Sequence, residues 1–136
     1  MAQLVARSEQ LAAFLADNNA RPWRPGHVDC CMVLADWAVW LGHPDPAPHL
    51  RGTYDSDAGF REIIAAHGGV VPLIASCIPA NGKRVQRPIL GSIGVIGSSS
   101  NIHRQFGAIF DGSGWLVRMH GSFGRMTAKT LATWDI

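Results

Sequence analysis

Two adjacent cysteines follow an aspartate in the stretch His27-Val28-Asp29-Cys30-Cys31. Asp is a favoured helix N-cap, and eleven of the twelve residues 30–41 are apolar, so we predict a buried helix over residues 30–41, capped by Asp29. In its first turn, unpaired N–H groups and the helix dipole favour the thiolate, the nucleophilic form of cysteine, and can bind an oxyanion. Cys30 is therefore a candidate nucleophile, although buried free cysteines are more often plain core residues.

A nucleophilic cysteine needs a base, and six histidines are available. His103 and His120 fall in segments with a strand pattern, and these strands should pack against the helix of residues 30–41. Either histidine alone is more commonly a half-exposed strand residue, but with Cys30 they form a candidate catalytic constellation. No metal is expected, because Cys30-Cys31 lacks the C-x-x-C spacing of a zinc site, and no motif indicates a cofactor.

The elements that must position these residues divide the chain into a helical half and a strand half. Helical patterns cover residues 9–17, 30–41, 58–67 and 71–77. Strand patterns cover residues 92–96, 103–110, 115–120 and 123–126. This order predicts one α+β domain over residues 1–136, in which the central helix packs on a C-terminal antiparallel sheet.

Composition excludes several classes of protein. The chain has 136 residues and a formal net charge of +2, so no basic surface indicates a nucleic-acid partner. The longest apolar stretch is interrupted by Asp36 and is too short to insert in a membrane, and no signal peptide is expected. Charged residues make up 16%, against about 25% in an average domain, which suggests that a partner covers part of the surface.

The order of parts resembles the NlpC-type, papain-like cysteine peptidases, which cleave peptides of the bacterial cell wall. The resemblance is carried by Asp29-Cys30, by Gly-Ala-Ile-Phe-Asp-Gly at residues 107–112 and by Met119-His120-Gly121. It implies a papain-like fold with Cys30 at the nucleophile position and His120 at the orienting position. The family's catalytic histidine corresponds to Gln105, which cannot act as a general base, and its sheet-opening Gly-Asp is Gly91-Ser92 here.

A longer pattern resembles a small branch of that superfamily associated with the tails of phages and prophages, also found in gene-transfer agents. It is carried by Trp-Arg-Pro-Gly-His-Val-Asp-Cys-Cys at residues 23–31, and by residues 42–46, 50–54, 68–69 and 133–136. This resemblance implies a component of the virion tail, present in the bacterial cytoplasm before assembly, with other phage tail proteins as partners.

Gln105 leaves two functions open. The favoured one is a structural or docking component of a phage tail tip with impaired catalysis. The alternative is an active cysteine endopeptidase or amidase that cleaves peptidoglycan peptides with Cys30 as nucleophile. The sequence is also compatible with an acyltransferase and with an assembly factor. The base would be His120 or His103, with Gln105 as orienter or oxyanion donor. His103 should share a strand face with Gln105, about 6–7 Å further along.

Four further residues are candidates for substrate binding or helix capping. Asp29 is the expected cap of the central helix. Trp23 can line a groove beside Cys30, although packing in the core is the commoner role of an aromatic residue. Arg51 and Tyr54 belong to the proline-rich loop of residues 43–54 after the central helix, and exposed loop residues in such a pattern often bind ligands. The structural alternative is that Arg51 only caps the end of a helix.

Overall fold

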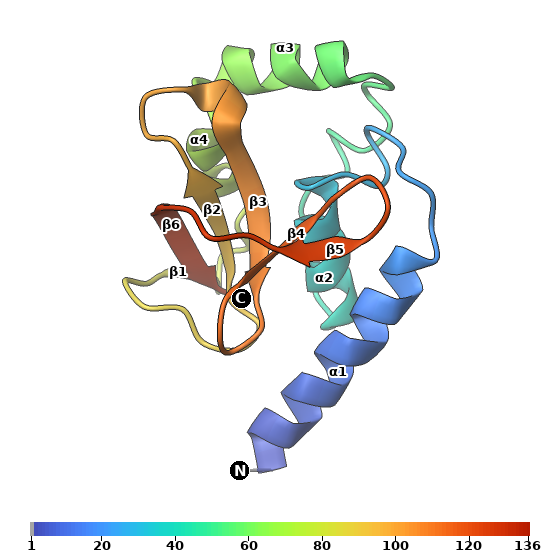
Figure 1. Cartoon of the computed structure of the whole chain (residues 1–136), viewed down its shortest axis with the longest axis vertical. Helices are drawn as coiled ribbons and strands as arrows, with labels where there is room; N and C mark the ends of the chain where they lie inside the picture. The colour runs from blue at the N-terminus through green and yellow to red at the C-terminus, as the bar shows by residue number, and fades with distance from the viewer. Residues whose placement is uncertain (1) are drawn as a thin grey trace.

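The computed structural model describes residues 2–136, and Met1 lies outside them. The described residues form an α+β fold with four α-helices and a six-stranded antiparallel sheet (Figure 1). The helices come first, as predicted: α1 (Ala2–Asn19), α2 (Met32–Trp40), α3 (Asp57–His67) and α4 (Val70–Ala75). Helix α1 extends beyond the predicted residues 9–17 at both ends.

The strands are β1 (Lys83–Arg84), β2 (Ile93–Gly97), β3 (Gln105–Phe110), β4 (Trp115–Arg118), β5 (Phe123–Arg125) and β6 (Thr130–Asp135). Their order in the sheet is β1-β6-β2-β3-β4-β5. The meander from β2 to β5 was predicted from the sequence. Strands β6 and β1 were not, and β6 lies inside the sheet, between β2 and β1.

Both candidate histidines lie outside the strands that were predicted to carry them. His103 belongs to a short 3-10 helix, η1 (Ile102–Arg104), because the Asn101 side chain accepts a hydrogen bond from the His103 N–H and starts a tight turn. His120 lies in the turn after β4, which the hydrogen bond from the Met119 N–H to the Ser122 carbonyl closes. The expectation that His103 and Gln105 share a strand face is therefore wrong.

Helix α2 packs against β3 at very short range. A Cβ atom on Gly107 of β3 would lie 2.4 Å from the carbonyl oxygen of Cys30, so only glycine permits this approach. Trp37, fully buried on α2, donates its indole N–H to the Gly91 carbonyl at 2.9 Å and so joins the helix to the start of the sheet. The predicted contact between the central helix and the sheet is confirmed.

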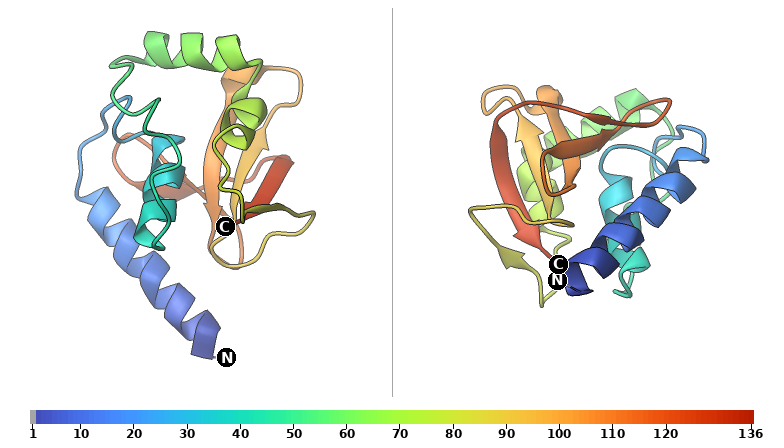
Figure 2. Two further views of the ribbon diagram at one scale, coloured as in Figure 1. Left: turned by 180° about the vertical axis from the view of Figure 1, so that it is seen from behind. Right: turned by 60° about the horizontal axis from the view of Figure 1, so that its bottom comes forward.

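Helices α3 and α4 cover the end and the rear of the sheet, whereas α1 packs against α2. Helix α3 crosses the end of the sheet where η1 lies (Figure 1), and it contacts η1. Helix α4 lies behind β2 and β3 in that view and comes to the front when the molecule is turned by 180° (Figure 2). Across residues 2–136, none of the helices has the length and apolar character needed to cross a membrane.

Candidate functional site

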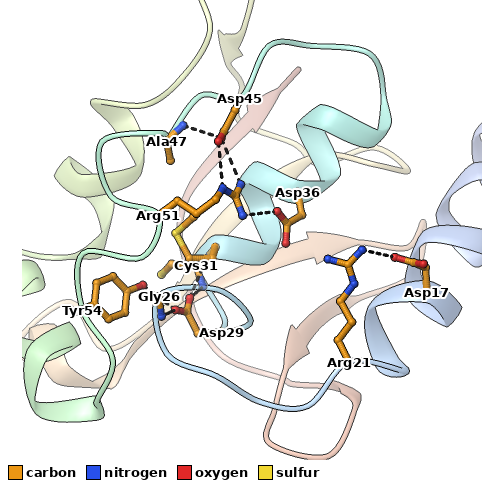
Figure 3. Close-up of polar contacts among 11 residues, drawn as sticks. Asp17, Arg21, Gly26, Asp29, Cys31, Asp36, Asp45, Ala47, Arg51 and Tyr54 are labelled. Carbon is orange, nitrogen blue, oxygen red and sulfur yellow. Dashed lines mark hydrogen bonds and ion pairs between the residues drawn. The ribbon is translucent and has the colours of Figure 1, made fainter.

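Asp29 organises the chain around the candidate nucleophile. Its side chain is fully buried, and its carboxylate accepts four hydrogen bonds (Figure 3). Oδ1 accepts from the backbone N–H groups of Cys31 at 2.9 Å and Met32 at 2.7 Å. Oδ2 accepts from the Gly26 N–H at 2.9 Å and from the Tyr54 hydroxyl at 2.6 Å. The Asp29 carboxylate therefore binds the N–H groups at the start of α2, but the helix begins at Met32 instead of Cys30 and its N-cap residue is Cys31, not Asp29 as predicted.

This capping changes what the start of α2 can do for Cys30. The N–H groups of Cys31 and Met32 are taken by Asp29, so the expectation that they are free to bind an oxyanion is wrong. Within the described residues, the N–H of Cys30 itself donates to no protein group. A single backbone donor at the thiol thus remains for an oxyanion.

The two adjacent thiols have different surroundings. They are free, and their Sγ atoms lie 4.0 Å apart. Cys31 also lines an apolar cavity behind α2, among core residues such as Leu34 and Ile74. The contact with the Cys30 sulfur, together with burial, raises the pKa of the Cys31 thiol. Cys31 is thus a protonated core residue at neutral pH. Cys30 is the thiol that lines the pocket described next.

Cys30 lines a pocket with a volume of about 350 Å³. The pocket also contains Trp23 from the loop before α2, His103 and Gln105 from η1 and the start of β3, and His120 from the turn after β4. Its remaining walls come from α3, β3, the end of β4 and the loop after β5: Asp57, Phe60, Arg61, Ile64, Phe106, Val117, Arg118, Met119 and Met126. The four candidate catalytic residues therefore share one pocket, although three of them are far from Cys30 in sequence.

Within this pocket His120 has a fixed neighbour. Its imidazole stacks on the indole of Trp23, with ring centroids 4.4 Å apart and planes inclined by 17°. His103 is exposed on η1 and makes no such stack. Among residues 2–136, neither imidazole is hydrogen-bonded to the Cys30 sulfur in this resting arrangement. Catalytic hydrogen bonds are often longer without substrate, so both rings remain candidates for the base.

Gln105 occupies the position expected for a catalytic histidine, and its amide is engaged elsewhere. Its Oε1 accepts from the Val70 N–H at 3.0 Å, and its Nε2 donates to the Ser98 carbonyl at 2.9 Å. Both ends of the side chain therefore hold the start of β3 to α4 and to the turn after β2. The expected role as an orienter of histidine or as an oxyanion donor finds no matching contact.

Comparison with known proteins places the chain in one family. Residues 3–136, nearly the whole chain, match the domain of unknown function (DUF6950). The chain belongs to the DUF6950 family. No curated protein matches it, and no solved structure matches it.

Two loop residues of this DUF6950 domain have structural roles outside the pocket. Arg51 pairs with Asp45 at 3.0 Å and with Asp36 at 2.7 Å, and so ties the proline-rich loop to α2 (Figure 3). Tyr54 is only 8% exposed, against the expectation of an exposed loop residue. Burial, followed by the neighbouring Asp29 carboxylate, raises the pKa of the Tyr54 hydroxyl, which therefore stays protonated and keeps donating to Asp29.

The pocket of the DUF6950 domain also contains charged residues that the sequence did not single out. Arg118 sits at the end of β4 and Arg61 on α3, and Asp57 is the single acidic side chain in the lining. The strand pattern could only indicate that Arg118 was a polar residue on β4, without showing that it is buried. In the described part of the chain, no three His, Cys, Asp or Glu side chains gather as a metal site would require.

Proposed function

We propose that this DUF6950 domain is a cysteine peptidase or amidase with Cys30 as its nucleophile and His120 as its base. The observation that carries the proposal is the convergence of Cys30, His120 and Trp23 on one open pocket. Cys30 is 7% exposed and packs in the core, but it also lines this pocket, and a cysteine with only a packing role would need no histidine held in the pocket by stacking. The geometry thus favours the alternative that the sequence had placed second.

The chemistry follows from the groups in the pocket. The Cys30 thiolate attacks an amide carbonyl, the C–N bond breaks, and the His120 imidazolium gives its proton to the leaving amine. The acyl group stays on Sγ as a thioester. The neutral imidazole then takes a proton from water, the hydroxide attacks the thioester, and the C–S bond breaks to return the thiolate and release the acid. The N–H of Cys30 is the backbone donor available to the oxyanion.

The proposed substrate is a peptide of the bacterial cell wall, and the proposed setting is a phage tail. Support comes from the resemblance of residues 23–31 and 107–112 to NlpC-type peptidases and their tail-associated branch. Helix α2 packed on β3 with Cys30 at the contact is the arrangement that a papain-like fold requires. The proposed partners are other tail proteins. The proposed location is the virion tail, and before assembly the protein is in the bacterial cytoplasm.

A cleavage assay with matched cysteine variants tests the proposal. Purified murein is incubated with the wild-type protein, with Cys30→Ala and with Cys77→Ala, and released peptides are measured by mass spectrometry. Cys77 lies outside the pocket, and burial raises the pKa of its thiol, so it is a suitable control. We expect turnover by the wild type and by Cys77→Ala, and none by Cys30→Ala. Equal turnover by Cys30→Ala would overturn the proposal.

A second function, a structural or docking component of the tail tip without catalysis, is favoured by one specific observation. Gln105 stands where the resemblance places the catalytic histidine, and both ends of its amide serve the scaffold. This function predicts that Cys30 reacts slowly with iodoacetamide in the folded protein and that the chain forms stable complexes with other tail proteins. Fast alkylation of Cys30 together with murein turnover would exclude it.

A further inference from the structure

The thiols of Cys30 and Cys31 contact each other just before α2. Their Sγ atoms lie 4.0 Å apart, within hydrogen-bond distance for two sulfur atoms, and neither thiol is in a disulfide. Adjacent side chains of a regular helix do not face each other, but α2 begins at Met32, so the two cysteines precede it. Both residues are buried, and water therefore does little to weaken the contact between the sulfurs.

Two sulfurs this close do not both carry a negative charge. Two buried thiolates 4.0 Å apart would repel each other strongly, so the pair gives up one proton far more readily than two. In the singly charged pair, the sulfur that keeps its proton donates its S–H to the thiolate, and a charged acceptor strengthens that bond. The surroundings of the two sulfurs decide which of them keeps the proton.

The surroundings of Cys31 favour its protonated form. Its side chain lines the apolar cavity behind α2, where a thiolate would lose its contact with water. The Asp29 carboxylate accepts a hydrogen bond from the Cys31 N–H and so adds a negative charge beside this thiol. The hydrogen bond with Cys30, followed by burial, raises the pKa of Cys31, and the opposing contact with the Gly107 backbone is the smallest of these effects. Cys31 is therefore the donor of the pair.

The surroundings of Cys30 favour a negative charge. Cys30 lines the pocket of about 350 Å³, whose walls carry more cationic than anionic groups. The titratable residues of that lining are Asp57 and Arg61 on α3, His103 on η1, Arg118 on β4 and His120. Asp29 and Tyr54, which are bonded to each other, are the titratable neighbours of Cys31. A thiolate is thus better tolerated at Cys30 than at Cys31.

We propose that Cys31 is a positioning residue for the nucleophile, whose S–H donates to the Cys30 sulfur and stabilises the Cys30 thiolate. The proton that Cys30 gives up goes to the His120 imidazole, whereas the Cys31 proton stays in place. The inference rests on the proposed function in taking Cys30 as the nucleophile. It concerns the protonation of Cys30, so it can be tested without cleavage.

The pH dependence of alkylation tests this role, because only the thiolate reacts with iodoacetamide. The wild type, Cys31→Ala and Cys31→Ser are alkylated between about pH 5 and pH 10, and the label on Cys30 is measured by peptide mass spectrometry. Ala and Ser are both smaller than Cys and differ only in the hydroxyl donor. In Cys31→Ala we expect the profile to move up by about one pH unit, so that alkylation at pH 7 slows by up to about tenfold. Cys31→Ser should restore most of the rate.

Cys77 is an internal control in the same samples. It lies outside the pocket, and its sulfur contacts His49 instead of the other two thiols. Its alkylation rate should therefore be equal in all three proteins. Urea denaturation shows whether the variants fold. Should Cys31→Ala fail to fold, Cys31→Val and Cys31→Thr form a second matched pair of nearly equal volume, and Cys30 should react several-fold faster in the Thr variant, which has the donor.

Coincident pH profiles of the wild type and Cys31→Ala, or of Cys31→Ala and Cys31→Ser, would overturn the role of Cys31. So would a wild-type protein in which iodoacetamide labels Cys31 before Cys30, or in which Cys30 reacts only above about pH 9. These outcomes are distinct from failure of the proposed function. If the profiles differ as expected and the wild type cleaves no murein, the role of Cys31 stands and the peptidase function falls. If the wild type cleaves murein and the profiles coincide, the reverse holds.

Discussion

The imidazole of His120 lies flat on the indole of Trp23, with ring centroids 4.4 Å apart and an angle of 17° between the planes. Trp23 comes from the loop before α2, and His120 comes from the turn after β4. Neither turn alone fixes the position of a side chain, so the stack is the contact that holds the imidazole in the Cys30 pocket. Trp23 is thus a positioning residue for His120.

Replacing Trp23 by Leu should release His120 and lower kcat/KM for murein peptides by about tenfold to a hundredfold, because small misplacements of a catalytic group are costly. The Hε1 signal of His120 should lose its upfield ring-current shift in the NMR spectrum, which shows that the stack is gone, and the loss of kcat/KM then measures what the stack contributes. Trp40→Leu is the control, since Trp40 is exposed on α2 and lies outside the pocket. Unchanged kinetics in Trp23→Leu would contradict this role.

The two histidines of the pocket should differ in their importance for catalysis. His120→Ala should lower kcat by about 100-fold or more, the usual contribution of a general base. His103→Ala should have a much smaller effect, because His103 is exposed on η1 and no stack holds its ring. Steady-state kinetics of both variants, with circular dichroism as a check on folding, measure the contrast. A larger loss in His103→Ala would assign the base to His103 instead.

Local patterns in the sequence were sufficient to predict the helices and the strands of the meander. Asp29 followed by an apolar stretch identified α2, and the strand patterns between residues 92 and 126 identified β2 to β5. Strand β6 was missed because it pairs with β2, more than thirty residues earlier, and nothing in its own residues indicates that partner. Pairing between distant segments depends on the packing of the whole chain, which local propensity does not contain.

The sequence predicted which residues form the candidate site better than it predicted how they are arranged. Cys30, His103, Gln105 and His120 do share a pocket, yet His103 lies in η1, His120 lies in a turn, and Gln105 bonds to the scaffold. A strand pattern cannot show where a strand ends when a side chain such as that of Asn101 starts a turn. Arg118 was missed because its burial depends on the end of α1, about one hundred residues away in sequence.

Gly107 should tolerate no side chain, because its Cβ would lie 2.4 Å from the Cys30 carbonyl oxygen. Gly107→Ala must push β3 away from the start of α2, at a cost of about 1–3 kcal/mol in the free energy of unfolding. Chemical denaturation measures this loss. Gly121→Ala is the matched control, since a Cβ there meets no atom within 4 Å, and it should change stability by less than about 0.5 kcal/mol.

The hydroxyl of Tyr54 should stabilise the fold through Asp29. Tyr54→Phe removes the 2.6 Å hydrogen bond to Asp29 Oδ2 and keeps the ring stacked on Phe60. A hydrogen bond to a charged group contributes about 1.5–3 kcal/mol, so the free energy of unfolding should fall by about that amount. Denaturation with urea measures it. A stability equal to that of the wild type would show that water replaces the hydroxyl at Asp29.

Arg51 should stabilise the fold in a pH-dependent way. Its hydrogen bonds lower the pKa of Asp45, whereas burial raises the pKa of Asp36 in spite of the same guanidinium. The stabilisation through Asp45 is complete above the ordinary Asp pKa of 3.8 and is lost as the pH falls through the lower folded value. Asp36 has the opposite sign, since its raised pKa disfavours the folded state when the carboxyl ionises.

Arg51→Ala leaves the partly buried Asp36 without its partner, so the variant should lose about 1–2 kcal/mol of unfolding free energy at pH 7. The loss should shrink as the pH falls, first as Asp36 is protonated, because its pKa is raised, and further once the pH passes below the lowered pKa of Asp45 and Arg51 has no charge to pair with. Denaturation curves of both proteins between neutral and acid pH measure this. Arg21→Ala, which breaks an exposed pair with Asp17, should cost at most about 0.5 kcal/mol. A loss in Arg51→Ala that stays constant with pH would mean that Arg51 acts by packing alone.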